Sequence, residues 1–175
     1  MTDDDNDWGQ WGCFTAFRIG RDELAALGAL TVASQELEFF VGTSIASLLN
    51  AFADSDALTA DVPFKTKIQI LGALVLRRVA GDATKTDRWK FLEKRLNDAR
   101  EDRNHFVHSI WTHDEWTDGE RTYIDELKAV KMRARKEPSV RPADKETLYG
   151  MARKAEKLAD ELAGFIFELW PGPSP

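Results

Sequence analysis

The chain has 175 residues, of which 43% are hydrophobic and 31% charged, and its formal net charge is −6. This size and composition are typical of one folded domain and exclude a disordered chain. The negative charge argues against a protein that coats nucleic acid non-specifically, because such binding depends on many neutralised phosphates. Cys13 is the only cysteine, which excludes an intramolecular disulfide and a Cys-rich zinc site and favours a reducing compartment.

Residues 1–20 form an acidic and aromatic N-terminal arm. Acids stand where a secretory signal needs a basic region and an apolar run, so we expect no export signal. The weakly polar stretch from Leu24 to Phe52 is interrupted by charged and amide side chains, which a membrane-spanning helix tolerates poorly. The sequence therefore predicts a cytoplasmic protein without a membrane span.

Two helices are expected in the first half of the chain. From Arg21 to about Ala53, apolar residues recur every three or four positions, which predicts one long helix. A break follows at Asp54-Ser55-Asp56, and Pro63 is well placed in the first turn of a second helix. Gly81-Asp82 ends that second helix.

The second half combines two further helices with a predicted hairpin. The third helix is expected to begin near Asp87 and to run past Phe106. Asp118-Gly119 is a turn signal, and residues 130–135 alternate as a strand does, which predicts a small β-hairpin. Asp144 then caps the last helix.

The fold class expected from these elements is all-α, a bundle of four to five helices with a small β-hairpin before the last helix. Residues 21–170 form the single helical domain, and residues 171–175, which contain prolines, form a frayed tail. We also expect a symmetric homodimer through the last two helices, since a polar motif on an apolar stripe makes sense where two copies meet.

The polar motif lies late in the third helix, in Arg103-Asn104-His105-Phe106-Val107-His108. Arg103 falls on the apolar stripe, and no acid stands three or four residues away on its own helix, so its partner must come from elsewhere. Glu101 lies four residues before His105 and is expected to pair with it at the surface. Asn104 and His108 are also four apart and share one face, next to that of Arg103.

Arginine and histidine together suit phosphodiester cleavage. Arginine offers a planar, permanently charged fork for a phosphate, and histidine exchanges protons near neutral pH. The alternative interpretation is structural: Arg103 bridges to an acid such as Glu36 or Glu38, and His108 is a satisfied core or interface histidine. Spacing alone leaves both interpretations open.

Arg103-Asn104 followed by His108 resembles the motif of the HEPN superfamily, in which an arginine and a polar residue precede a histidine by four to six positions in a helical bundle. The resemblance covers residues 21–169. It implies a homodimer and a metal-independent endoribonuclease without cofactors, of the kind found in toxin–antitoxin, antiviral and RNA-processing systems. Other members have lost activity, so a non-catalytic helical dimer that binds protein or RNA is the alternative.

Carried onto this chain, the resemblance makes Arg103 and His108 the catalytic pair and Asn104 the orienting residue. Glu101 and Asp102 depart from a favourable pattern, because their charge repels an RNA backbone unless it is neutralised.

Basic residues that could compensate follow the motif. Residues 128–141 hold six bases and one acid, and we expect Lys131, Arg133 and Arg135 to contact RNA. An antitoxin or another protein is the further partner that the resemblance implies. A metal site of His105, His108, His113 and Asp114 is the weaker hypothesis, since these residues do not share one helical face.

Overall fold

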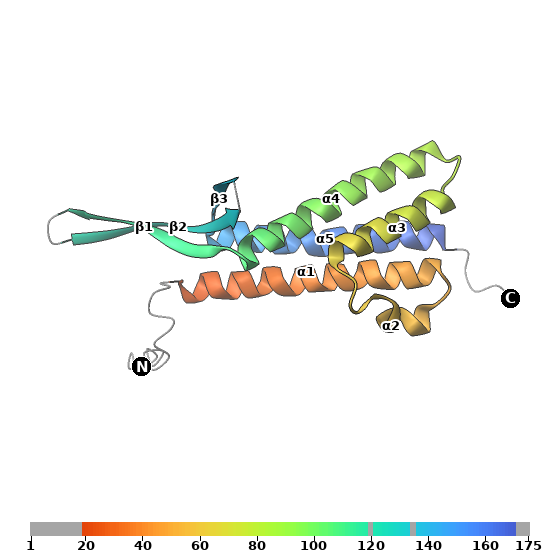
Figure 1. Cartoon of the computed structure of the whole chain (residues 1–175), viewed down its shortest axis with the longest axis horizontal. Helices are drawn as coiled ribbons and strands as arrows, with labels where there is room; N and C mark the ends of the chain where they lie inside the picture. Colours follow the sequence, from red (N-terminus) through yellow and green to blue (C-terminus); the bar gives the residue numbers. More distant parts are fainter. Residues whose placement is uncertain (1–18, 119–120, 134–135, 171–175) are drawn as a thin grey trace.

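A computed structural model describes residues 19–118, 121–133 and 136–170. Within them the α-helices are α1 (Arg21–Leu48), α2 (Ser55–Thr59), α3 (Phe64–Arg78), α4 (Ala83–Val107) and α5 (Lys145–Leu169), with a short 3-10 turn at Phe52–Asp54. Strands β1 (Ile110–Asp118), β2 (Arg121–Arg133) and β3 (Lys136–Pro142) lie between α4 and α5 (Figure 1). The predicted all-α bundle with a β-element before the last helix is confirmed.

Helices α1 and α5 lie side by side and run in the same direction (Figure 1). Their starts are joined by the ion pair of Lys145 with Asp22, at 2.8 Å. Helix α4 runs the opposite way, since Arg88 near its start bonds to Glu168 near the end of α5. The core between the helices is formed by fully buried apolar side chains, among them Leu37, Leu71, Trp89, Leu96, Phe106, Leu148, Leu162 and Phe165.

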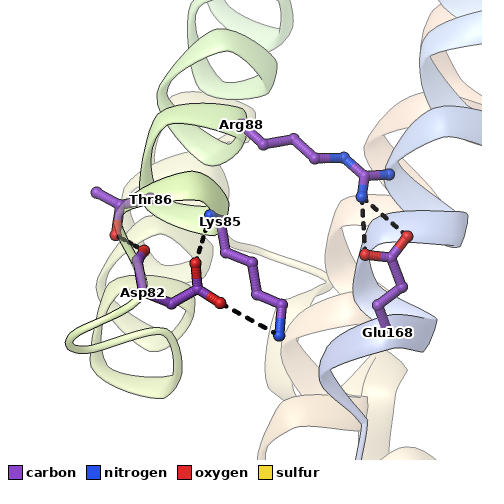
Figure 2. A network of polar contacts seen from close by, with 5 residues as sticks. All are labelled: Asp82, Lys85, Thr86, Arg88 and Glu168. Atoms are coloured by element: carbon purple, nitrogen blue, oxygen red, sulfur yellow. Dashed lines mark hydrogen bonds and ion pairs between the residues drawn. The ribbon is translucent and has the colours of Figure 1, made fainter.

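Aspartates begin both long helices of the second half. The side chain of Asp144 accepts a hydrogen bond from the Thr147 backbone N–H at 2.8 Å, so the predicted cap of α5 is confirmed. Helix α4 starts about one turn before the expected Asp87, because Asp82 caps it by accepting a hydrogen bond from the Lys85 N–H at 3.0 Å (Figure 2).

The β-element is larger than a hairpin. Its three antiparallel strands are ordered β1-β2-β3, with Trp111 opposite Ala129 and Val130 opposite Val140. The expected turn around Gly119 falls outside the described residues. Pro142 belongs to β3, where it pairs with Lys128. An edge strand tolerates a proline, because one side of the strand needs no ladder hydrogen bond.

The inner face of the sheet packs on the last turns of α4. Ala129 of β2 is fully buried, and its carbonyl accepts a hydrogen bond from His105 Nε2 at 3.0 Å. His105 is only 2% exposed, so its expected position at the surface is wrong. The strand covers the helix face that sequence spacing had left to solvent.

Helix α1 is, among the described residues, long and apolar enough to cross a membrane by length and composition. Core helices of globular proteins pass the same test. Its buried residues pack into the bundle core, among them Ala26, Leu30, Leu37, Val41 and Ile45. The expected arm of residues 1–20 lies outside the described residues up to position 18, and so does the tail from 171 to 175.

Candidate active site at the end of α4

The end of α4 is held in place by the packing of Phe106 against Trp111 of β1. Phe106 is fully buried, and its carbonyl accepts a hydrogen bond from Trp111 Nε1 of β1 at 3.0 Å. The Ser109 hydroxyl donates to the His105 carbonyl, where the helix gives way to β1. With Phe106 directed into the core, the motif residues on either side are held in fixed orientations.

Arg103 lies at the edge of this packed face and is half-buried. Its guanidinium donates a hydrogen bond from Nη1 to Asn104 Oδ1 at 3.1 Å, its one polar contact within the described residues. The bridge to Glu36 or Glu38 that the structural alternative requires is not formed among the described residues, and Glu38 pairs instead with Lys67 at 2.8 Å. Several guanidinium N–H groups therefore remain available to a ligand.

His108 occupies the C-cap position of α4, with φ −111° and ψ 18°. Its side chain is exposed and makes no hydrogen bond with the part of the chain that the structure describes. The interpretation of His108 as a core histidine is therefore wrong for this chain. An exposed imidazole at this position can exchange protons with solvent or with a bound substrate.

The three motif residues do not share one face of α4. Each helical residue turns by about 100°, so His108 lies about 40° from Asn104 but about 140° from Arg103. The contact of Arg103 with Asn104 directs the guanidinium toward the side that carries His108. Asn104 thus stands between the two groups and orients the arginine.

The acids that precede Arg103 are both paired with bases. Asp102 accepts a hydrogen bond from Arg141 of β3 at 2.6 Å, and Glu101 pairs with Arg100 at 3.1 Å. Such pairing cancels much of the repulsion that two free carboxylates would exert on a polyanion. The sequence did not identify Arg141 as the partner of Asp102, although Arg141 belongs to the basic stretch.

Of the three residues predicted to contact RNA, Lys131 is the one whose side chain the structure describes. Its Nζ donates a hydrogen bond to the carbonyl of Asn104 at 3.0 Å, so β2 brings a cation directly to the motif. This also places a positive charge at the C-terminal end of α4, where the helix dipole favours it. Arg133 ends β2, but its side chain is not described, and Arg135 lies outside the described residues.

The weaker hypothesis of a metal site fails for His105 and His108, which do not face the same environment. His105 is buried against Ala129, whereas His108 is exposed. The side chains of His113 and Asp114 are not described. Among the residues that are, no group of three or more His, Cys, Asp and Glu side chains is placed to hold a metal ion.

Comparisons with known proteins give no match for this chain. No protein-family model matches the chain, and searches of curated proteins and of solved structures find no match. The class that the fold defines is a helical bundle with a three-stranded antiparallel sheet.

Proposed function

We propose that the protein is a HEPN-like, metal-independent endoribonuclease that acts as a homodimer in the cytoplasm. Arg103 and His108 are its catalytic pair, and Asn104 orients the arginine. The observation that carries the proposal is that Arg103 and His108 have polar groups available to a ligand. Among the described residues Arg103 bonds to Asn104 alone, and the exposed His108 side chain has no hydrogen-bond partner. The buried N–H groups of an arginine with a purely structural role would be satisfied inside the fold, and the exposed His108 imidazole is accessible to a substrate.

The surroundings of the motif favour a polyanionic substrate. Asp102 and Glu101 are paired with Arg141 and Arg100, and Lys131 lies against the backbone of Asn104. Arg133 and Arg135 extend this basic segment along the chain. We therefore assign RNA binding to the end of α4 together with the middle of the sheet.

In the proposed reaction a ribose 2′-hydroxyl attacks the adjacent phosphorus, and the bond from phosphorus to the 5′-oxygen breaks. His108 takes the proton of the attacking hydroxyl or delivers a proton to the leaving oxygen. The Arg103 guanidinium stabilises the negative charge that develops on the phosphorane oxygens. The products are a 2′,3′-cyclic phosphate and a 5′-hydroxyl, and the reaction needs no oxidant, reductant or metal.

A dimer follows from the placement of these groups on α4. Arg103 and His108 are separated by about 140° around the helix and by about 7.5 Å along it. The arginine of one copy and the histidine of another can approach one phosphate from opposite sides. We propose that two copies of the α4 C-terminus face each other in this way, at a two-fold axis.

The test is cleavage of a mixed RNA pool by purified protein in EDTA. Arg103→Ala and His108→Ala are expected to lower the cleavage rate by about 10²-fold or more, the scale of a lost general acid–base group. Arg77→Ala is the matched control, because Arg77 is an exposed arginine of α3 away from the motif. Equal rates for the wild type and both motif variants would contradict the proposal.

A binding module without catalysis is the second candidate. It is favoured by large apolar side chains exposed on α1, on α5 and at the C-cap of α5, namely Phe39, Phe40, Phe167 and Trp170. Exposed apolar groups of this size are typical of protein-binding surfaces. An antitoxin is the partner that the HEPN resemblance suggests. A wild-type protein that cleaves no RNA, but co-purifies with a defined protein partner, would favour this second candidate.

A further inference from the structure

A second concave site lies between α4 and α5, with α1 at its base. It has a volume of about 460 Å³, within the range of ligand-binding pockets. Arg95, Asp98, Ala99 and Asp102 line it from α4, and Met151, Lys154, Ala155, Lys157 and Leu158 line it from α5. Leu30 and Ser34 of α1 form its floor. We refer to it as the α4–α5 cleft.

Small side chains on the facing helices explain the space. Ala99 of α4 and Ala155 of α5 line the α4–α5 cleft. Alanine fills little of the distance between neighbouring helices, and larger side chains there would close it. Leu30, Met151 and Leu158 supply an apolar surface around these positions. The interior of the cleft therefore suits an apolar body.

Ser34 gives the floor an unsatisfied polar group. The residue is 6% exposed, and its hydroxyl has no hydrogen-bond partner within the described part of the chain. Other hydroxyls of α1 bond to the carbonyl four residues earlier, as Thr31 does to Leu27 and Ser44 does to Phe40. A buried hydroxyl without a partner is costly, and a polar ligand atom would remove that cost.

The rim of the cleft carries a net positive charge. Its acids are neutralised, since Asp98 pairs with Lys94 and Asp102 pairs with Arg141. Arg95 is likewise paired, with Glu161. Lys154 and Lys157, by contrast, are exposed and have no ion-pair partner among the described residues. Two lysines three residues apart on α5, beside an apolar interior, attract an anion attached to an apolar body.

We propose that the α4–α5 cleft binds a small amphipathic organic anion. Its apolar body lies between Ala99 and Ala155, a polar atom reaches the Ser34 hydroxyl, and its anionic group lies at Lys154 and Lys157. The site is separate from the Arg103–His108 pair and does not depend on ribonuclease activity. Its lining includes Asp102 but none of Arg103, Asn104 and His108.

The test uses the full chain and two fluorescent probes. Anilinonaphthalene sulfonate has an aromatic body with one anionic group, and N-phenylnaphthylamine is a closely related body without the charge. The double variant Lys154→Gln/Lys157→Gln is expected to bind the sulfonate about fivefold more weakly, since two partly screened charges are lost, and the neutral probe equally well. Lys65→Gln/Arg77→Gln, on α3, removes the same charge from exposed positions and is expected to change neither affinity.

A second measurement uses a variant in which the α4–α5 cleft is filled. Ala99→Leu places a larger side chain between the helices and is expected to abolish saturable binding of both probes, with the fold checked by circular dichroism. No saturable sulfonate binding by the wild type would overturn the proposal. It would also be overturned if Phe167→Ser abolished binding while Ala99→Leu left it intact, because the probe would then occupy the exposed aromatic surface.

Discussion

The two ends of α4 are held in different ways. Its start is closed by residues close in sequence, because Asp82 caps the Lys85 N–H and the Thr86 hydroxyl bonds to the Asp82 carbonyl. Its end depends on residues distant in the chain. His105 bonds to Ala129, and Asn104 accepts a hydrogen bond from Lys131.

This difference explains why α4 is well packed along most of its length and still carries an exposed histidine, His108, at its end. In the start and middle of α4, Asp82 caps the first turn, Arg88 and Arg95 pair with acids of α5, and the apolar side chains pack into the core. The last turn is instead covered on one face by β2, which accepts a hydrogen bond from His105 Nε2 and leaves His108 in solvent. The sheet thus decides which of two neighbouring histidines is structural and which is available for chemistry.

Stability should fall most when the packed first half of α4 is disrupted. Trp89 is fully buried and stacks on Phe165, with ring centroids 6.3 Å apart. Trp89→Ala leaves a cavity and is expected to lower the free energy of unfolding by about 3–5 kcal/mol. Urea unfolding followed by circular dichroism measures it. A loss no larger than that of an exposed control, Phe91→Ala, would contradict this account of the core.

The end of α4 is tested by His105→Leu, which fills the buried position with an apolar side chain and removes the Nε2 donor to Ala129. We expect a loss of about 1–2 kcal/mol in the free energy of unfolding, the scale of one buried hydrogen bond. Hydrogen exchange of the β2 amides should accelerate more than that of the α5 amides. Equal acceleration in β2 and α5 would mean that His105 does not attach the sheet to the helix.

A local cap should give a smaller effect that depends on pH. Hydrogen bonds from the Thr147 backbone and hydroxyl hold the pKa of Asp144 below its ordinary value of 3.8. A depressed folded-state pKa stabilises the fold above the unfolded pKa, and this contribution is lost as the pH falls through the folded pKa.

Asp144→Ala is therefore expected to cost about 1 kcal/mol at neutral pH and progressively less below about pH 4. Urea midpoints across this pH range measure the change. Asp144→Asn keeps an acceptor and should show little of the pH dependence. A cost of Asp144→Ala that stayed constant down to pH 2 would show that the ionised carboxylate is not what caps α5.

The smallest effect on stability is expected at the ion pair beside the motif. Both Arg141 and Asp102 are partly exposed, so Arg141→Gln should change the free energy of unfolding by less than about 1 kcal/mol. Arg141→Gln should also slow RNA cleavage, because Asp102 without its partner repels the substrate. This effect should be larger at low salt than at high salt, since salt screens the repulsion. The double variant Asp102→Asn/Arg141→Gln should recover the activity. Failure to recover would assign Arg141 a direct role in binding RNA.

The sequence predicts the long helices because their signals are local, but the break expected at Asp54-Ser55-Asp56 is wrong, since a 3-10 turn and then α2 occupy this segment. Apolar spacing located α1 and α3, and Asp144 marked the start of α5. The start of α4 was placed too late because Asp82 had been assigned to the end of the preceding helix. Strand β3 was missed, since Pro138 and Pro142 argue against a strand unless it is known to lie at a sheet edge.

The candidate site was predictable in its residues but not in its environment. Spacing singled out Arg103, Asn104 and His108, and it showed that no acid on the same helix could pair with Arg103. It could not show that β2 buries His105, or that Arg141, 39 residues away, neutralises Asp102. These contacts depend on how the sheet folds back on α4, which helical periodicity does not encode.

Complementation between two inactive variants shows whether two copies of the chain share one active site. Arg103→Ala and His108→Ala proteins are mixed, allowed to exchange subunits and assayed for RNA cleavage in EDTA. If one site takes Arg103 from one copy and His108 from the other, the mixed dimer keeps one intact site and activity returns. A mixture that stays inactive beside an active wild type would contradict the shared site, and an inactive wild type would contradict ribonuclease activity itself.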